Sequence, residues 1–237
     1  KAHGYVDMRR ALAVSSNVYF FEIGGGYKNQ RGLGIAKLEE YARLFGLGEA
    51  TGIDLPGETE GAIPSPAWKE EHFPGDPWRI GDTYNTAIGQ YGFQVTPIQL
   101  VRAVAAIANG GDIIRPRIFL GAGEENQGTP DTLRTLSLAE VDLAVVREGM
   151  RLGVTEGIAQ AVNMPFVDVA AKTGTAEIGT AKRYVHSWIS GFFPYARPRY
   201  AFAVVMEKGP ENTLRGAAFA MRTLFEWIYT NRPEYVE

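Results

Sequence analysis

Apolar residues recur at helical spacing over much of the first two thirds of the chain and again near its end. The apolar stripes are formed by Ile35, Leu38, Ala42 and Phe45, by Leu100, Val104 and Ile107, and by Ala218, Met221, Leu224, Phe225 and Ile228. Because one face of a helix returns every three or four residues, each stripe predicts a helix that packs against a core. Gly46 and Gly110 end the first two helices, and the third covers about 214–229.

Polar residues at the predicted helix starts are of the types that satisfy free backbone N–H groups. Asp7 and Thr96 each precede an apolar segment, and Pro97 occupies a first helical position. Ser137 and Glu140 have the spacing of a capping box, which predicts a helix over 138–152. A short helix after Asp7 and a second one over 18–23 leave residues 15–17 as a helix-to-helix turn.

Strand patterns dominate the last third of the chain. Runs rich in β-branched and aromatic residues predict strands at 167–171, 188–193 and 200–206, with a hairpin loop at 195–199. A strand-like run at 113–120 leads into a polar stretch at 121–132, which is expected to be a surface loop. The segment 51–84 is rich in proline and glycine, which predicts irregular structure. Helices followed by three strands and a closing helix predict an α+β fold with an antiparallel sheet.

Composition narrows the classes of function. The chain has 237 residues, of which 45% are hydrophobic and 22% charged, as in ordinary globular domains. A net charge of −3 argues against a nucleic-acid partner, and the absence of cysteine excludes disulfides, thiolate metal sites and cysteine nucleophiles. His3, His72 and His186 lack the spacing of metal ligands, so no metal is expected. No apolar run reaches the roughly 18 residues of a membrane helix.

Two short motifs carry groups that acyl transfer requires. One is Ser15-Ser16-Asn17, and the other is Lys172-Thr173-Gly174-Thr175. Ser15 has a hydroxyl that can accept and donate a proton, and Asn17 has an amide that can hold a substrate carbonyl. Lys172 adds positive charge beside a substrate carboxylate. Ser15, Asn17 and Lys172 are therefore the candidate catalytic residues, and their side chains are expected to converge on one groove.

The residues that follow Lys172 suit a bound peptide. Thr173 and Thr175 offer hydroxyl donors to its carboxylate, and the Thr175 N–H is a candidate oxyanion donor. Gly174 has no side chain, so a peptide backbone can lie flat along the strand. Trp188 is a candidate lining residue of the same groove. Each motif alone is common in proteins, so the assignment depends on finding both in this order.

Longer segments around both motifs resemble the class B penicillin-binding proteins. These segments are RRALAVSSNVYFFEIG at 9–24, TGIDLPGETEGAIPSPAWK at 51–69, AIGQYGFQVTPIQLVRAVAAIANGG at 87–111, AAKTGTAE at 170–177, HSWISGFFPY at 186–195 and RYAFAVVME at 199–207. The resemblance runs from about Gly4 to Tyr229, and His186 with Trp188 favours the penicillin-binding protein 2 branch. It implies the fold of penicillin-binding proteins and serine β-lactamases. Tyr91 departs from the family pattern, in which glycine is expected.

The resemblance implies a D,D-transpeptidase that cross-links peptidoglycan through a serine acyl-enzyme, without metal or organic cofactor. Its ligands would be stem peptides ending in D-Ala-D-Ala, and β-lactam antibiotics that mimic them. Its partners would be a peptidoglycan glycosyltransferase and the elongation complex. The protein would be anchored in the cytoplasmic membrane of a bacterium, with this domain facing the periplasm or the extracellular side.

One part of the family pattern is missing. The family's nucleophile is a serine followed three residues later by lysine, and it precedes the Ser-x-Asn motif. The chain has six serines, and none of them has lysine at that position. The expectation is that residues 1–237 form a partial transpeptidase domain, truncated before the Ser-x-Asn motif. The first strands of the sheet and the nucleophile would lie upstream, and this chain alone is predicted to be inactive.

Three other functions fit the same residues. A D,D-carboxypeptidase or β-lactamase of this fold would use water as the acyl acceptor, although the long segment at 51–84 argues against it. A non-catalytic β-lactam sensor or cell-wall scaffold would not need Ser15, Asn17 and Lys172 together. A pure interaction module in a cell-wall complex is the alternative from a different class. A Ser-x-x-Lys in the coding sequence before Lys1 would favour the enzyme.

Overall fold

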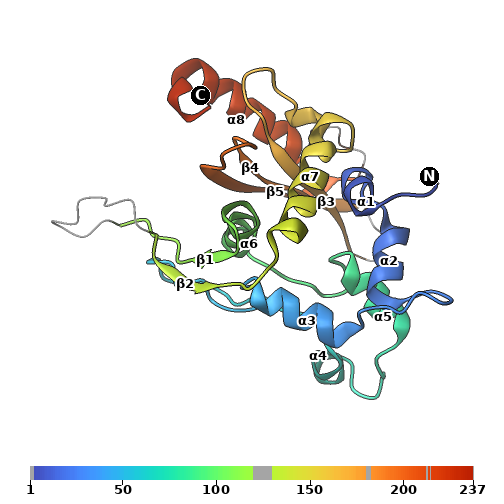
Figure 1. The fold of residues 1–237 in the computed structure, drawn as a ribbon. Coiled ribbons are helices and arrows are strands. Elements are labelled where there is room, and N and C mark those ends of the chain that lie inside the picture. Colours follow the sequence, from blue (N-terminus) through green and yellow to red (C-terminus); the bar gives the residue numbers. More distant parts are fainter. Residues whose placement is uncertain (1–2, 120–129, 180–182, 212, 214, 237) are drawn as a thin grey trace. The chain divides into compact units, whose positions relative to one another are not determined.

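A computed structural model describes residues 3–119, 130–179, 183–211, 213 and 215–236 (Figure 1). The chain divides into two compact units. The first unit comprises Lys1–Ser15, Ile107–Gly110 and Leu138–Glu237, and the second comprises Ser16–Ala106 and Gly111–Ser137.

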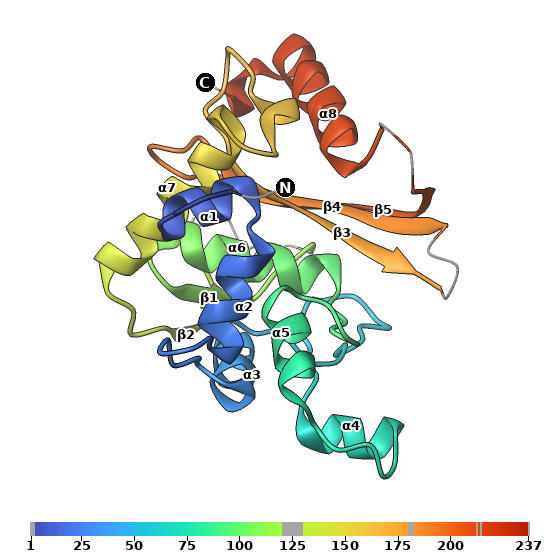
Figure 2. The same ribbon diagram turned by 90° about the vertical axis from the view of Figure 1, so that its right-hand side faces the viewer.

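The first unit is built on a three-stranded antiparallel sheet in the order β3-β4-β5. Its elements are α1 (Met8–Val14), α7 (Glu140–Thr155), η1 (Gln160–Val162), β3 (Ala170–Ile178), β4 (Tyr184–Phe193), β5 (Tyr200–Pro210), α8 (Ala217–Asn231) and η2 (Pro233–Tyr235). Helix α8 lies along one face of the sheet (Figure 2). Met221 and Phe225 of α8 are buried against Ile189 and Phe193 of β4 and Phe202 of β5. The predicted α+β layout with three antiparallel strands is confirmed.

The second unit is mainly helical. Its elements are α2 (Asn17–Gly25), α3 (Ile35–Leu44), α4 (Pro66–His72), α5 (Ile80–Ala87), the part of α6 (Pro97–Asn109) up to Ala106, β1 (Asp112–Ile114) and β2 (Thr132–Thr135). Helix α2 approaches α5 closely, because a Cβ on Gly24 would lie 2.4 Å from that of Ala87. The hydroxyl of Tyr84 donates a hydrogen bond of 2.8 Å to the carbonyl of Gly26, which follows the end of α2.

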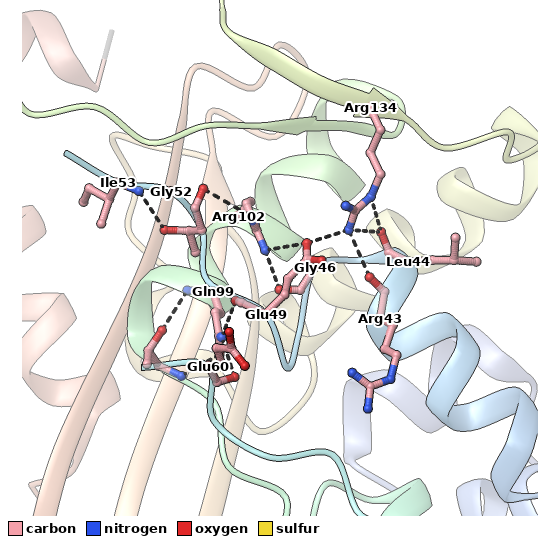
Figure 3. Close-up of polar contacts among 12 residues, drawn as sticks. Arg43, Leu44, Gly46, Glu49, Gly52, Ile53, Glu60, Gln99, Arg102 and Arg134 are labelled. Carbon is pink, nitrogen blue, oxygen red and sulfur yellow. Dashed lines mark hydrogen bonds and ion pairs between the residues drawn. The ribbon is translucent and has the colours of Figure 1, made fainter. Parts of the chain in front are cut away.

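Two buried polar side chains of α6 hold the irregular segment 46–61 in place (Figure 3). The side-chain amide of Gln99 donates to the carbonyls of Glu49 and Glu60, both at 2.8 Å. The guanidinium of Arg102 donates to the carbonyls of Gly46 and Thr51 and pairs with Glu49. Since these carbonyls belong to no helix or strand, the two side chains replace the hydrogen bonds that regular structure would supply.

The hydrogen bonds of Arg102 predict a specific effect of its replacement on stability. Replacing it with methionine keeps much of the side-chain volume but leaves the carbonyls of Gly46 and Thr51 without their donor. The second unit should lose about 2–4 kcal/mol of unfolding free energy. Arg115→Met is the matched control, because Arg115 pairs with Asp131 on the surface and should cost about 0.5 kcal/mol or less. Urea denaturation measures both, and equal losses would contradict the structural role of Arg102.

Several predicted helix boundaries are confirmed. Asp7 caps α1 by accepting a hydrogen bond of 2.8 Å from the N–H of Arg10. Thr96 caps α6, which begins at Pro97, by accepting from the N–H of Gln99 at 3.3 Å. Residues 15 and 16 separate α1 from α2, whereas residue 17, predicted to belong to the turn, already begins α2.

Other predictions from local sequence are wrong. The capping box is absent, since α7 begins at Glu140 after Ala139, which makes no side-chain cap. Before it, the N–H of Leu136 donates to the carbonyl of Gly111. The segment 51–84 contains α4 and most of α5, because Ser65 caps α4 by accepting from the N–H of Trp68 and Pro66 occupies a first helical position. Proline therefore marks the start of a helix at that position and not irregular structure.

The predicted strand and loop bounds need correction. Strand β4 begins at Tyr184, before the predicted 188, and β5 continues to Pro210, past the predicted 206. Strand β3 covers Ala170–Ile178, so the Lys-Thr-Gly-Thr motif lies within a strand and not after one; Val167 forms only an isolated bridge with Met164. Strand β1 ends at Ile114, short of the predicted 113–120. Most of the predicted loop at 121–132 lies outside the described residues, and its last residue begins β2.

Tyr91 stands where the resemblance predicts glycine. Its φ of 61° falls in the left-handed region, so the loop keeps a backbone conformation that favours glycine. The ring packs edge-on against Trp68 and Trp78, with centroids 5.9 and 5.8 Å away. These aromatic contacts offset the backbone strain.

Candidate active site

Ser15 ends helix α1 in a conformation that is unfavourable for a residue with a side chain. Its φ of 52° and ψ of 57° are left-handed, and its N–H donates to the carbonyl of Leu12 at 3.3 Å. This conformation costs a non-glycine residue about 1–2 kcal/mol. Strain of this kind is concentrated at functional sites, where surrounding contacts enforce it. Ser15 is therefore a candidate functional residue on backbone geometry as well as on sequence.

Glycines of α7 and the residues after it bring α1 against the sheet. A Cβ on Gly153 would lie 3.0 Å from the carbonyl oxygen of Ala171 and 3.8 Å from Cα of Ala13. A Cβ on Gly157 would lie 2.1 Å from the carbonyl oxygen of Ala13, which also accepts a hydrogen bond from Ile158. Gly153 thus touches β3 one residue before Lys172 and α1 two residues before Ser15. This close packing positions the Ser15 side chain beside Lys172.

Lys172 meets Ser15 across 157 positions of sequence. Its Nζ lies 2.8 Å from Oγ of Ser15 and 2.6 Å from the carbonyl oxygen of Thr173. Burial lowers the pKa of the Lys172 ammonium to about 8, because the charged form is poorly solvated there. The predicted contact between Ser15 and Lys172 is confirmed. A lysine with this pKa can hold or release a proton near neutral pH.

Strand alternation sorts the remaining motif residues. The cross-strand pairs between β3 and β4 are Lys172 with Ser190, Thr173 with Ile189, Gly174 with Trp188 and Thr175 with Ser187. Lys172, Gly174 and Trp188 therefore share one face of the sheet. Thr173 and Thr175 lie on the opposite face, the one covered by α8, so they reach a ligand only from the edge of β3. Their contact with a substrate carboxylate stays a prediction.

Asn17 is the first residue of α2 and is exposed. It belongs to the second unit, whereas Ser15, Lys172 and Trp188 belong to the first. The convergence of its side chain with the other two catalytic candidates stays a prediction.

Within the described part of the chain, the outer edge of β3 carries no paired strand, because β3 is the first strand of the sheet order. Gly174 and Thr175 are exposed there. An open edge with a glycine can accept an extended peptide as an additional strand. A peptide bound in this way would run beside the contact between Lys172 and Ser15.

The sequence model of the penicillin binding protein transpeptidase domain matches residues 1–226. The chain belongs to this family. Membership agrees with the geometry of the first unit, since Ser15 of one motif contacts Lys172 of the other.

Individual relatives place the chain more closely. The peptidoglycan D,D-transpeptidase MrdA of Acinetobacter baumannii is 32% identical over 248 residues, which cover 97% of this chain and 36% of that protein. The penicillin-binding protein PBP2 of Helicobacter pylori, solved as a complex with MreC, has a TM-score of 0.78 at 31% identity, over 96% of this chain and 41% of that one. PBP2 of Pseudomonas aeruginosa, solved with WCK 5153, has a TM-score of 0.79 at 29% identity, over 97% and 50%. The chain spans about a third of the curated relative's length, and it is of the PBP2/MrdA type.

No cluster of three or more potential metal ligands occurs among the described residues. In the same part of the chain, no helix combines the length and apolarity needed to cross a bilayer.

Proposed function

We propose that this chain is part of a peptidoglycan D,D-transpeptidase that cross-links the cell wall through a serine acyl-enzyme. The observation that supports this most directly is the 2.8 Å contact between Lys172 Nζ and Ser15 Oγ beside the open edge of β3. The family and the transpeptidase names of its relatives supply the reaction class. Residues 1–237 would then be part of one transpeptidase domain.

The donor in this proposal is a stem peptide ending in D-Ala-D-Ala. It binds along the edge of β3, with its terminal carboxylate attracted by Lys172 and its backbone passing over Gly174. A serine oxygen attacks the carbonyl of the penultimate D-Ala and loses its proton, and the terminal D-Ala leaves as an amine that gains a proton. An amine of a neighbouring stem peptide then takes the acyl group and releases the serine.

The nucleophile is proposed to lie before Lys1 of this sequence. None of the six serines has lysine three positions later, and Ser15 occupies the Ser-x-Asn motif. Ser15 can instead relay the proton, because its hydroxyl accepts from Lys172 and keeps its own hydrogen for donation. A lysine whose pKa is about 8 suits this exchange near neutral pH.

The remaining candidates bind the donor. Asn17 would hold a substrate carbonyl, and the N–H of Thr175 would donate to the oxyanion. The hydroxyls of Thr173 and Thr175 would contact the terminal carboxylate from the strand edge. Trp188, paired with Gly174 across β3 and β4, would line the groove on the face of Lys172.

The proposal extends to partners and location. Because the PBP2 of Helicobacter pylori has been solved with MreC, the parent of this chain would bind an elongation-complex protein of that kind. A peptidoglycan glycosyltransferase would supply the strands to be linked. The domain would face the periplasm or the extracellular side, with its membrane anchor outside residues 1–237.

Labelling with a fluorescent penicillin tests the proposal. The full-length protein, which would include sequence before Lys1, should form a covalent adduct, because β-lactams mimic the acyl donor. Residues 1–237 alone should not be labelled, because they contain no Ser-x-x-Lys serine. Mass spectrometry of the adduct should identify that upstream serine. An adduct on Ser15, or a full-length protein that does not react, would refute the assignment of the nucleophile or of the reaction.

A further inference from the structure

His186 of β4 lies on the same face of the sheet as Lys172. The cross-strand pairs on this face are Lys172 with Ser190, Gly174 with Trp188, and Ala176 with His186. The adjacent residue, Ser187, lies on the opposite face, where its hydroxyl accepts a hydrogen bond of 3.0 Å from the N–H of Ala217 at the start of α8. His186 therefore faces away from α8, further along β3 than the contact between Lys172 and Ser15.

A β-bulge is built around His186. Val185 pairs with Gly209 and Ser187 pairs with Met206, so two residues of β5, at 207 and 208, stand opposite His186 alone. Lys208 has a φ of 53°, which is left-handed and strained for lysine. Bulges of this kind redirect side chains and are frequent beside active sites. The strain at Lys208 is a feature that the sheet would not need for pairing alone.

The bulge also fixes the chemistry of the imidazole. The N–H of Lys208 donates to Nδ1 of His186 at 3.4 Å, so Nδ1 is the acceptor nitrogen. In the neutral ring, the hydrogen then resides on Nε2, which becomes a hydrogen-bond donor. Among the residues that the structure describes, no hydrogen bond or ion pair uses Nε2. His186 is only partly buried, so this donor is available to a ligand.

A donor peptide on β3 has one direction in which to continue past the reacting carbonyl. Towards the start of β3, Gly153 of α7 packs against the carbonyl oxygen of Ala171 and closes the path. Towards the other end, Glu177 of β3 and Gly179 just after the strand are exposed. Gly174 and Ala176 are small, so they leave space over β3 beside Trp188 and His186. The rest of the donor would pass this part of the face.

We propose that His186 is a specificity-determining residue, whose Nε2–H donates a hydrogen bond to a carboxylate or carbonyl oxygen on the part of the acyl donor beyond the reacting carbonyl. The proposal rests on the transpeptidase function above. In this proposal the bulge at Lys208 keeps the imidazole in the tautomer that carries its hydrogen on Nε2.

Two substitutions test the roles of the two ring nitrogens separately. In His186→Asn the side-chain oxygen can still accept from the N–H of Lys208, but the distal donor is lost. In His186→Gln the amide N–H extends to the position of Nε2, but the acceptor at Nδ1 is lost. Full-length wild type and both variants are acylated with benzylpenicillin and with carbenicillin, which differ by one carboxylate on the acyl side chain.

The measured quantity is the ratio of the two acylation rate constants, carbenicillin over benzylpenicillin. His186→Asn should lower this ratio about tenfold, the effect of one hydrogen bond to a charged group, and His186→Gln should stay near wild type. The melting temperature of His186→Gln should be lower than that of His186→Asn, because only His186→Gln loses the acceptor for the N–H of Lys208.

Three outcomes would count against the inference. Equal ratios in all three proteins refute the role of His186 and leave the transpeptidase proposal intact. A lower ratio in His186→Gln than in His186→Asn, parallel to stability, shows that His186 acts only through the bulge and also refutes the role. No acylation of wild type by either penicillin refutes the proposed function itself.

Discussion

Replacing Lys172 with methionine in the full-length protein should slow acylation by a fluorescent penicillin by about 100-fold or more. The variant keeps the apolar stem of the side chain but removes the ammonium that lies 2.8 Å from Ser15 Oγ. Loss of one preorganised electrostatic contact at a reacting centre costs about this much. Stopped-flow labelling measures the rate, and a rate within threefold of wild type would remove Lys172 from the mechanism.

The same substitution should change how stability depends on pH. Burial lowers the pKa of Lys172 from its usual value near 10.5 to about 8 in the folded chain. Between these two values the unfolded chain binds more protons than the folded chain, so wild-type stability should rise as pH increases from about 8 to 10.5. Lys172→Met should lack this contribution to the rise. Chemical denaturation of both proteins across this pH range tests the sign.

Ser15→Gly should lose acylation while gaining stability. The glycine variant removes the hydroxyl beside Lys172, so labelling should fall by about 100-fold. It also relieves the left-handed conformation at φ 52°, which should add about 0.5–1 kcal/mol to the unfolding free energy after the entropy of glycine is counted. Thermal unfolding and labelling of the same preparations give both values.

Ser15→Ala separates these two effects. Alanine also lacks the hydroxyl but keeps the backbone strain, so its labelling should match that of Ser15→Gly while its stability falls below it by roughly 1 kcal/mol. If alanine and glycine are equally stable, the strain assigned to Ser15 is not present in solution. If either variant labels at the wild-type rate, Ser15 does not carry the proton.

What could be predicted from sequence was the local part of the fold. Helix α3 and the start of α6 follow from apolar spacing and from Thr96 with Pro97, signals contained within one or two turns. The extent of β3 could not be predicted in this way. The motif from Lys172 to Thr175 has little strand character, and it is extended because β4 pairs with it continuously from Ala170 to Ile178. Long-range pairing overrides local preference there.

The same distinction between local and long-range signals applies to the candidate site. The chemical types of Ser15 and Lys172 marked them from sequence, and the structure confirms that they meet. The left-handed backbone of Ser15 and the bulge at Lys208 have no sequence signal, since neither residue is glycine. Both conformations are imposed by tertiary contacts. A role for His186 at the site could not be predicted either, because a lone histidine without metal-ligand spacing carries no indication of a bulge around it.

In the transpeptidase proposed above, Gly157 would restrict which natural variants could escape an inhibitor. Any other residue would place its Cβ 2.1 Å from the carbonyl oxygen of Ala13, so it would push the end of α1 away from β3. Such a substitution would slow acylation by the substrate and by the drug alike, because both reactions would depend on the position of Ser15. In a saturation-mutagenesis library grown under β-lactam selection, this codon should remain glycine, and resistance should come from residues that contact only the drug.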